Sequence, residues 1–142
     1  MTDITLAIVG ATGLVGKEIL AILEERQFPV KNLVLLASKR SADTVLSFNG
    51  SSIKVQELTQ DSFHNVDISL FSAGSSISEK FAPIAAKAGA VVVDNTSFFR
   101  MDPSVPLVVP EVNKHALKNH NGIIANPNCS TAQLVMALKP IH

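Results

Sequence analysis

The stretch Gly10-Ala11-Thr12-Gly13-Leu14-Val15-Gly16 decides the fold. It follows a continuous apolar run at 4–9 and opens a helical pattern at 14–25. A glycine-rich turn between a strand and a helix brings backbone N–H groups close to a phosphate, and the positive end of the helix dipole favours the anion. The glycine spacing differs slightly from the dinucleotide fingerprint, so a turn that merely packs tightly is the alternative. With its flanking strand and helix, we interpret the turn as a nucleotide site.

The same stretch comes close to a P-loop, because Gly16 is followed by Lys17. The loop has one residue too many, however, and Glu18 stands where a P-loop has the Ser or Thr that binds magnesium. The pattern therefore argues against a P-loop nucleotide hydrolase.

Composition restricts the class of protein. The 142 residues are 46% hydrophobic and 17% charged, which predicts one folded domain. Twelve basic and twelve acidic residues cancel, so no basic patch indicates a nucleic acid partner. Met1-Thr2-Asp3 lacks the basic start of a signal peptide, no apolar run could span a bilayer, and the single cysteine fits a reducing compartment. We expect a cytoplasmic protein that binds neither nucleic acid nor membrane.

Strand and helix patterns alternate along the chain, which predicts an α/β fold. Asn49-Gly50 adds a short hairpin between 45–48 and 53–55. We expect a Rossmann-like, doubly wound, mostly parallel sheet with right-handed crossovers. The expected strands are 4–9, 33–37, 66–71, 90–93 and 123–125, and the expected helices are 14–25, ended by Pro29, then 77–87, 113–118 and 130–138.

The residues after the second strand indicate which nucleotide binds. An NAD site usually has an acidic residue there for the ribose hydroxyls, whereas this chain has Ser38-Lys39-Arg40-Ser41. Two cations and two hydroxyls suit a 2′-phosphate, because arginine offers a planar fork of donors. A solvated basic turn is the alternative, but beside the glycine turn the pattern favours NADP over NAD.

Two residues near the ends of later strands are candidates for chemistry. Cys129 lies past a strand at the start of a helix, where the dipole stabilises a thiolate nucleophile; the alternative is a buried structural cysteine. Arg100, in a loop after a strand, could bind a phosphate or carboxylate, or pair on the surface with Asp102. We expect no metal site and surface positions for the histidines, because their spacing fits no metal motif; they are His64, His115, His120 and His142.

Six motifs together resemble the bacterial type of aspartate-semialdehyde dehydrogenase. The resemblance covers essentially the whole chain, and the combination is more specific than any one motif. In order, the motifs are 10–16 GATGLVG, 37–42 ASKRSA, 71–76 FSAGSS, 93–100 VDNTSFFR, 109–113 VPEVN and 126–131 NPNCST.

The resemblance implies roles for individual residues. Cys129 would be the nucleophile that forms the acyl-enzyme, Arg100 would bind the substrate phosphate, and Asn95 and Asn128 would line the active site beside them. The residues that it implies for NADP binding are Gly10, Thr12, Gly13, Leu14, Val15, Ser38, Arg40, Ser41, Ser72 and Gly74.

The reaction implied by the resemblance is the reversible reductive dephosphorylation of aspartyl phosphate to aspartate semialdehyde, on the route to lysine, methionine and threonine. Members of the family continue into a catalytic and dimerisation domain. We therefore expect 1–142 to be the NAD(P)-binding domain, ending in the segment that carries the nucleophile. On its own it should keep NADP affinity, lack turnover and expose an apolar face, while the full-length enzyme should be a homodimer.

Two other functions stay open. N-acetyl-glutamyl-phosphate reductase resembles this fold and also uses a cysteine, and a dehydrogenase-like binding module could keep the fold without turnover. The segment 126–131 and the Ser-Lys-Arg-Ser turn favour the semialdehyde enzyme. The cysteine in its intact-looking motif disfavours a non-catalytic module.

Overall fold

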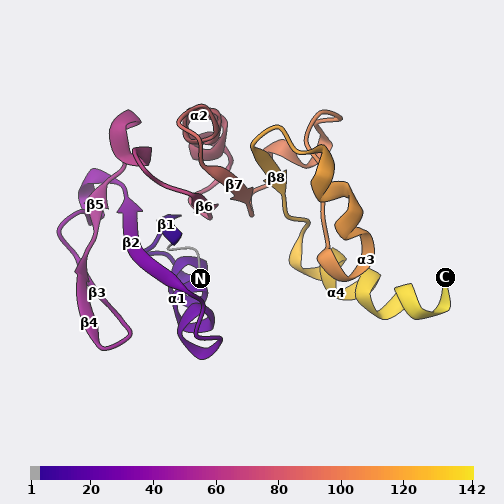
Figure 1. Ribbon diagram of the computed structural model, residues 1–142, viewed down its shortest axis with the longest axis horizontal. Helices are drawn as coiled ribbons and strands as arrows, with labels where there is room; N and C mark the ends of the chain where they lie inside the picture. Colours follow the sequence, from indigo (N-terminus) through magenta and orange to yellow (C-terminus); the bar gives the residue numbers. More distant parts are fainter. Residues whose placement is uncertain (1–3) are drawn as a thin grey trace.

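Parallel strands form the centre of the molecule in the computed structural model, which describes residues 4–142. Six of them make one sheet in the order β5-β2-β1-β6-β7-β8, and β3 and β4 form a separate antiparallel hairpin. Figure 1 shows α1 and α2 on opposite faces of the sheet. The fold is therefore α/β and Rossmann-like, as the sequence predicts. Met1-Thr2-Asp3, on which the expectation of no signal peptide rests, lie outside the described residues.

The elements follow one another as strand–helix units. The strands are β1 (Ile4–Val9), β2 (Val30–Ala37), β3 (Val45–Phe48), β4 (Ser51–Lys54), β5 (Gln56–Glu57), β6 (Ile68–Phe71), β7 (Val91–Asp94) and β8 (Ile123–Ala125). The α-helices are α1 (Leu14–Glu25), α2 (Ser75–Lys87), α3 (Pro110–Asn113) and α4 (Cys129–Leu138). Short 3₁₀ helices are η1 (Lys39–Ser41), η2 (Gln60–Phe63), η3 (Phe98–Met101), η4 (Lys114–Asn119) and η5 (Lys139–Ile141).

The core has one part on each face of the sheet. Side chains alternate along β1, so Val9 packs with Phe81 of α2, whereas Ile8 packs with Leu20 of α1. Because both faces are covered, the central strands are continuous apolar runs rather than alternating ones. This explains why the strands were recognisable in the sequence.

Gly16 sets how closely α1 approaches the sheet. A Cβ atom on this residue would lie 2.3 Å from the carbonyl oxygen of Gly10 and 2.7 Å from the Cα of Ala11. Gly10 is constrained mainly by its φ of +90°, and a Cβ there would lie 3.0 Å from the backbone of Ser72 and Ala73. The glycine turn does pack tightly, and the same packing brings the start of α1 to the ends of the strands.

The structure corrects two predictions about helices. Helix α1 ends at Glu25, as the pattern at 14–25 predicts, but Pro29 does not end it: Gln27 adopts a left-handed φ of +48° and the N–H of Phe28 donates to Leu23 O at 3.0 Å. The predicted helix at 113–118 is wrong in type: α3 starts at Pro110, which suits a first helical position, and continues as the 3₁₀ helix η4.

One buried hydroxyl has no partner. Ser69 of β6 lies beside Ala7 and Val92, fully buried on the face that α2 covers, and its Oγ makes no hydrogen bond. Since an unpaired buried hydroxyl costs free energy, we expect Ser69→Ala to raise the free energy of unfolding by about 1 kcal/mol. Urea denaturation followed by circular dichroism measures the change.

Ser78→Ala is the matched control for this prediction. Ser78 of α2 is as buried as Ser69, but its hydroxyl donates to Asp94 at 2.8 Å. Its removal should lower the free energy of unfolding by about 1–3 kcal/mol, because it leaves a buried carboxylate with one donor fewer. Equal destabilisation by the two substitutions would contradict the prediction for Ser69.

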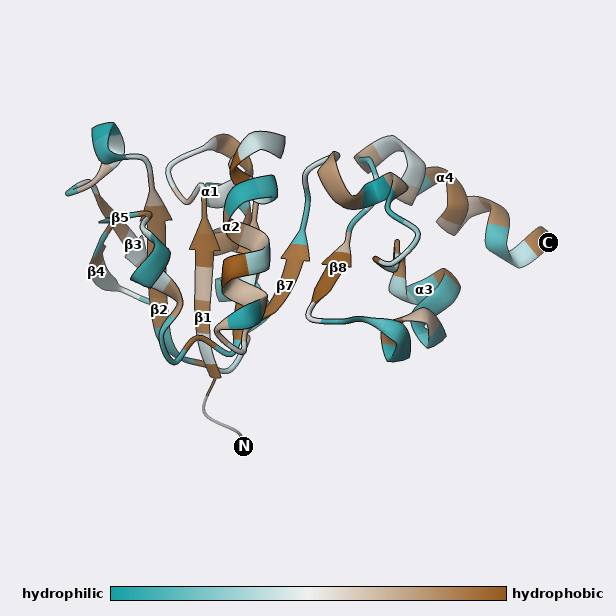
Figure 2. Cartoon of the chain, turned by 90° about the horizontal axis from the view of Figure 1, so that it is seen from above, coloured by the Kyte–Doolittle hydropathy of each residue, from teal (hydrophilic) through white to brown (hydrophobic). Residues whose placement is uncertain are grey.

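Helix α4 lies beside the sheet rather than over it. It lies beyond the β8 edge of the sheet, leads to the C-terminus of the chain and carries mostly apolar residues (Figure 2). None of its residues is buried, and Leu134 and Leu138 expose 58% and 46% of their surface; Ile141 of η5, which follows, exposes 82%. The described chain thus leaves an apolar surface without a cover, as the sequence predicts.

Candidate functional site

A cavity of about 400 Å³ opens where β1, β2 and β6 end. Parallel strands place their carboxyl ends at one edge of a sheet, which is where open α/β folds bind ligands. Seven of the ten residues predicted to bind a nucleotide line this cavity, and they come from three separate loops. They are Gly10, Thr12, Gly13, Ser38, Arg40, Ser41 and Ser72.

The glycine turn uses some of its N–H groups internally. Gly10 and Ala11 donate to Leu36 O at 2.8 and 3.2 Å, and Gly13 donates to Gly10 O at 3.0 Å. Leu14 and Val15, the first two residues of α1, have no intrahelical acceptor for their N–H groups. The N–H groups at the start of α1 are therefore available to an anion, whereas the N–H of Gly13 is used within the turn.

The loops around the cavity are fastened to one another. Ser72 donates to Val9 O through its N–H at 2.9 Å and through its hydroxyl at 3.2 Å, which ties the end of β6 to the end of β1. Leu58 donates to Ala37 O at 2.8 Å and holds the segment after β5 against the end of β2. The walls are thus positioned before any ligand binds, which lowers the cost of binding.

Apolar residues that sequence reasoning missed complete the cavity. Ile77 and Phe81 line it from α2 and Leu58 lines it from the segment after β5. The first two are four residues apart, so they share one face of the helix. In the sequence, the signal for this surface was two apolar residues four apart in a helix that follows a strand. An apolar surface of this kind suits the flat face of a nucleotide base.

Three of the predicted residues lie outside the cavity lining. Leu14 and Val15 are 88% and 44% exposed at the start of α1, and Gly74 is the N-cap of α2. Leu14 and Val15 would therefore contact an anion through their backbone N–H groups and not through their side chains.

A second cluster of polar groups lies at the ends of β7 and β8. Asp94 is fully buried, and its carboxylate accepts hydrogen bonds from Ser78 Oγ at 2.8 Å, Thr96 N at 3.0 Å and Thr96 Oγ1 at 2.8 Å. These bonds fix the loop that follows β7 and carries Asn95. Sequence reasoning assigned no role to Asp94, although a carboxylate that ends a buried strand needs several donors.

Arg100 is half-buried and held by backbone carbonyls. Its Nε donates to Asn126 O at 2.9 Å and its Nη2 to Asn95 O at 3.0 Å. The expected alternative, a surface pair with Asp102, is wrong: Asp102 is bonded to Ser104, whose hydroxyl and then N–H hold the pKa of Asp102 below its usual range. Three of the five N–H donors of Arg100 are left for a ligand.

Cys129 is exposed and is the first residue of α4. The preceding Asn128 caps the helix, because its Oδ1 accepts the N–H of Ser130 at 2.9 Å, and the same oxygen lies 3.9 Å from the cysteine sulfur. The alternative of a buried structural cysteine is wrong. The thiol is accessible at the N-terminus of α4. Shortly before it in the chain, β8 ends at Ala125 and is followed by Asn126, whose carbonyl oxygen accepts the hydrogen bond from Arg100.

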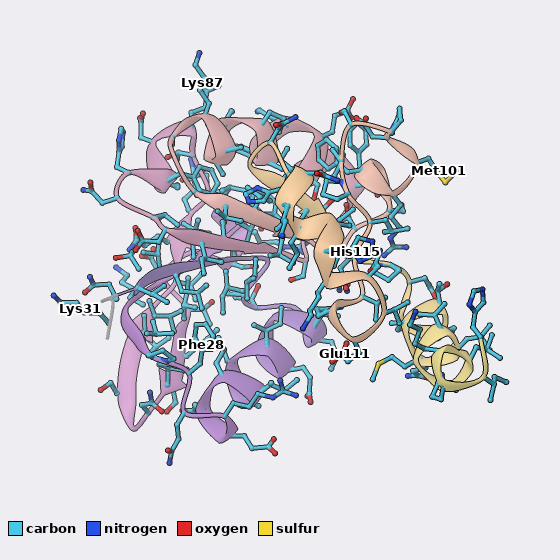
Figure 3. All side chains as sticks on the ribbon, turned by 45° about the vertical axis from the view of Figure 1, so that its right-hand side comes forward. Phe28, Lys31, Lys87, Met101, Glu111 and His115 are labelled. Carbon is cyan, nitrogen blue, oxygen red and sulfur yellow. The ribbon has the colours of Figure 1, made fainter. Side chains whose placement is uncertain are left out.

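Among residues 4–142, no histidine hydrogen-bonds to this thiol, whose partner is Asn128 Oδ1. His64, His115 and His142 are exposed, whereas His120 is half-buried and its Nδ1 accepts the N–H of Gly122 at 3.1 Å. Figure 3 shows His115 and Glu111 around α3, and Met101, 91% exposed, projecting from η3. Within residues 4–142, no three His, Cys, Asp or Glu side chains gather as a metal site. In the same range, no helix combines the length and apolar character needed to cross a membrane.

Comparison with known proteins identifies the family. The family described as semialdehyde dehydrogenase, NAD binding domain matches residues 5–120, which include the glycine turn, the basic turn and Arg100. The chain belongs to the semialdehyde dehydrogenase family. Its NAD-binding domain is the part matched here.

Relatives in the semialdehyde dehydrogenase family are close in sequence. The aspartate-semialdehyde dehydrogenase of Bacillus subtilis is 59% identical over 136 residues, and that of Aquifex aeolicus is 59% identical over 139. These matches cover 96% of this chain but only 39% and 41% of the relatives. The chain thus spans about two fifths of the length of the curated relatives and corresponds to their N-terminal part.

Solved structures of the family agree with the fold. Vibrio cholerae aspartate semialdehyde dehydrogenase II, in complex with ASA, superposes with a TM-score of 0.93 at 55% identity, over 99% of this chain and 46% of that one. The Candida albicans enzyme with NADP superposes with a TM-score of 0.78 at 30% identity, over 96% and 46%. A Rex-family repressor at 16% identity and a TM-score of 0.60 shares the fold alone.

Proposed function

We propose that this chain is the NADP-binding and nucleophile-bearing part of an aspartate-semialdehyde dehydrogenase. The observation that carries the proposal is the arrangement of two sites along one sheet edge: a nucleotide-sized cavity lined by Gly10 and Arg40, and an accessible Cys129 at the start of α4. The names of the close relatives support the reaction. The remaining length of those relatives would supply the rest of the active site and the homodimer contacts, in the cytoplasm.

The residues present fit NADP at three points. The N–H groups that open α1 suit a pyrophosphate, and Ile77 and Phe81 provide apolar surface. Arg40 and Ser41 of η1 line the cavity beside Ser38, and among residues 4–142 no acidic side chain lines it. A cation in that position attracts a 2′-phosphate, whereas NAD would present only hydroxyls there.

The proposed chemistry assigns one task to each polar group. The Cys129 thiolate attacks the carbonyl carbon of aspartyl phosphate; the carbon–oxygen bond to the phosphate breaks, and phosphate leaves with the bonding electron pair. Arg100 binds the phosphate through the N–H groups that Asn95 O and Asn126 O do not use. The dipole of α4 stabilises the thiolate before attack and again when the thioester breaks. Bound NADPH supplies the hydride that reduces the thioester to aspartate semialdehyde.

Arg40 tests the choice of nucleotide. We expect Arg40→Ala to weaken NADP binding by the 142-residue chain by about tenfold or more, because a charge-assisted hydrogen bond to phosphate contributes about 1.5–3 kcal/mol. NAD binding should stay unchanged, since NAD lacks the 2′-phosphate. Isothermal titration calorimetry with both nucleotides measures the two affinities.

Lys39→Ala is the control for this test. Lys39 precedes Arg40 in η1 and carries the same charge, but it does not line the cavity. Lys39→Ala removes one positive charge, as Arg40→Ala does, but the chain should keep most of its preference for NADP over NAD. The proposed 2′-phosphate contact would be refuted if Arg40→Ala weakened the binding of NAD and NADP equally. It would also be refuted if Arg40→Ala and Lys39→Ala had the same effect on NADP binding.

A further inference from the structure

Asn126 joins the two loops that follow β7 and β8. Its N–H donates to Asp94 O at 2.8 Å, its side-chain Nδ2 donates to Asn95 Oδ1 at 2.7 Å, and its carbonyl oxygen accepts Arg100 Nε at 2.9 Å. Asn126 thus makes hydrogen bonds to Asp94, Asn95 and Arg100. Asn126 is half-buried, so these bonds are partly shielded from water and stronger than on an open surface.

The side-chain bond determines how Asn95 is oriented. A carboxamide has an acceptor end and a donor end, and exchanging them needs a rotation of half a turn about the last side-chain bond. The Nδ2 of Asn126 occupies the oxygen of Asn95, so the –NH2 of Asn95 is the end left for other partners. Asn95 therefore offers two hydrogen-bond donors at the sheet edge.

The same bonds set the position of Arg100. One of its two backbone acceptors belongs to Asn126 and the other to Asn95, whose side chain Asn126 also holds. A guanidinium fixed at two points loses little conformational entropy when it binds an anion with its remaining N–H groups. The donors of Asn95 and of Arg100 thus depend on one residue.

We infer that Asn126 is a positioning residue that orients the Asn95 carboxamide and the Arg100 guanidinium as joint donors to an oxygen-rich anionic group of the ligand. The inference rests on the proposed function only for the identity of that ligand, which is an acyl phosphate, the mixed anhydride of a carboxylic acid and phosphoric acid. Asn126 itself contacts no reacting atom. It acts by turning the amide of Asn95 and by fixing both backbone carbonyls that Arg100 uses.

Nuclear magnetic resonance of the 142-residue chain tests the orientation directly. In the wild-type chain, the side-chain amide protons of Asn126 should exchange slowly with water, whereas those of Asn95 should exchange fast. In Asn126→Asp the new carboxylate only accepts, so Asn95 should rotate and its amide protons should become the protected pair. In Asn126→Ala neither pair should be protected. Protected Asn95 protons in the wild type, or no change of Asn95 in Asn126→Asp, would overturn the inference.

Steady-state kinetics of the longer enzyme tests the consequence. Asn126→Ala, which adds no charge, should lower kcat/KM for the acyl phosphate by about tenfold or more, as expected when a fixed donor is lost. Asn126→Asp should lower it further, because it presents the oxygen of Asn95 to an anion. The KM for NADPH should not change, because Asn126 does not line the nucleotide cavity.

Asn119→Asp is the matched control, since Asn119 is exposed at the end of η4 and the substitution adds the same charge. It should leave kcat/KM and the exchange of the Asn95 side-chain amide protons unchanged. Wild-type kcat/KM in both Asn126 variants would refute the positioning role. A wild-type enzyme with no activity on the acyl phosphate would refute the proposed function, while the amide exchange would still decide the orientation of Asn95.

Discussion

Gly16→Ala is expected to lower the free energy of unfolding by about 3 kcal/mol or more, a large share of the 5–15 kcal/mol typical of a domain. The added Cβ would lie 2.3 Å from Gly10 O and 2.7 Å from the Cα of Ala11. Both neighbours are backbone atoms, and Gly10 and Ala11 are held by hydrogen bonds to Leu36 O, so α1 has to move away from the sheet. Urea denaturation measures the loss.

The sign of this effect makes the test sharp. Replacing glycine by alanine inside an ordinary helix stabilises it by about 1 kcal/mol, so helix propensity alone predicts the opposite result. Gly13→Ala is the matched control: a Cβ there would lie 3.3 Å from the same Gly10 O, a distance that a small shift relieves. Stability of Gly16→Ala equal to or above that of Gly13→Ala would show that the close approach of α1 does not matter.

The second large effect concerns Cys129. In the longer enzyme proposed above, Cys129→Ser should lower kcat by about 10³-fold or more, because it removes the covalent nucleophile. The reaction is followed as phosphate-dependent reduction of NADP by aspartate semialdehyde. NADP affinity, measured on the 142-residue chain, should stay the same because Cys129 does not line the nucleotide cavity.

Gln133→Ala provides the control on the same helix. Gln133 lies one turn after Cys129, is exposed and makes no contact in the site. It should keep its activity and its NADP affinity. Residual turnover of Cys129→Ser close to that of Gln133→Ala would exclude a thioester on this cysteine and leave only the binding role of the chain.

Local patterns were enough for most of the fold. The apolar run at 4–9, the glycine turn and the helical pattern at 14–25 are contiguous in sequence, so strand, turn and helix could be recognised without distant residues. The helix at 113–118 failed because two helix types share similar spacing there, and the choice between them depends on Pro110 and on the contact of Asn113 with Leu107 O and Val109 N.

The site divides in the same way. Residues next to strand ends, such as Ser38 and Ser72, were predictable, because parallel strands all end at one edge. The occupied N–H of Gly13 and the partners of Arg100 were not, since those bonds depend on atoms that only folding brings together. Asn126 shows this most clearly: its neighbours Asp94 and Asn95 are more than thirty residues away.

By itself, the sequence determined an α/β chain with a glycine turn, a basic turn and a cysteine at a helix start, because each of these depends on a few adjacent residues. The tertiary structure decided which donors remain for ligands. It does so because a buried N–H or carbonyl pairs with whatever lies nearest in space, and the sheet places β7 and β8 side by side. That pairing leaves three N–H groups of Arg100 and the –NH2 of Asn95 as the donors that the proposed anion site would use.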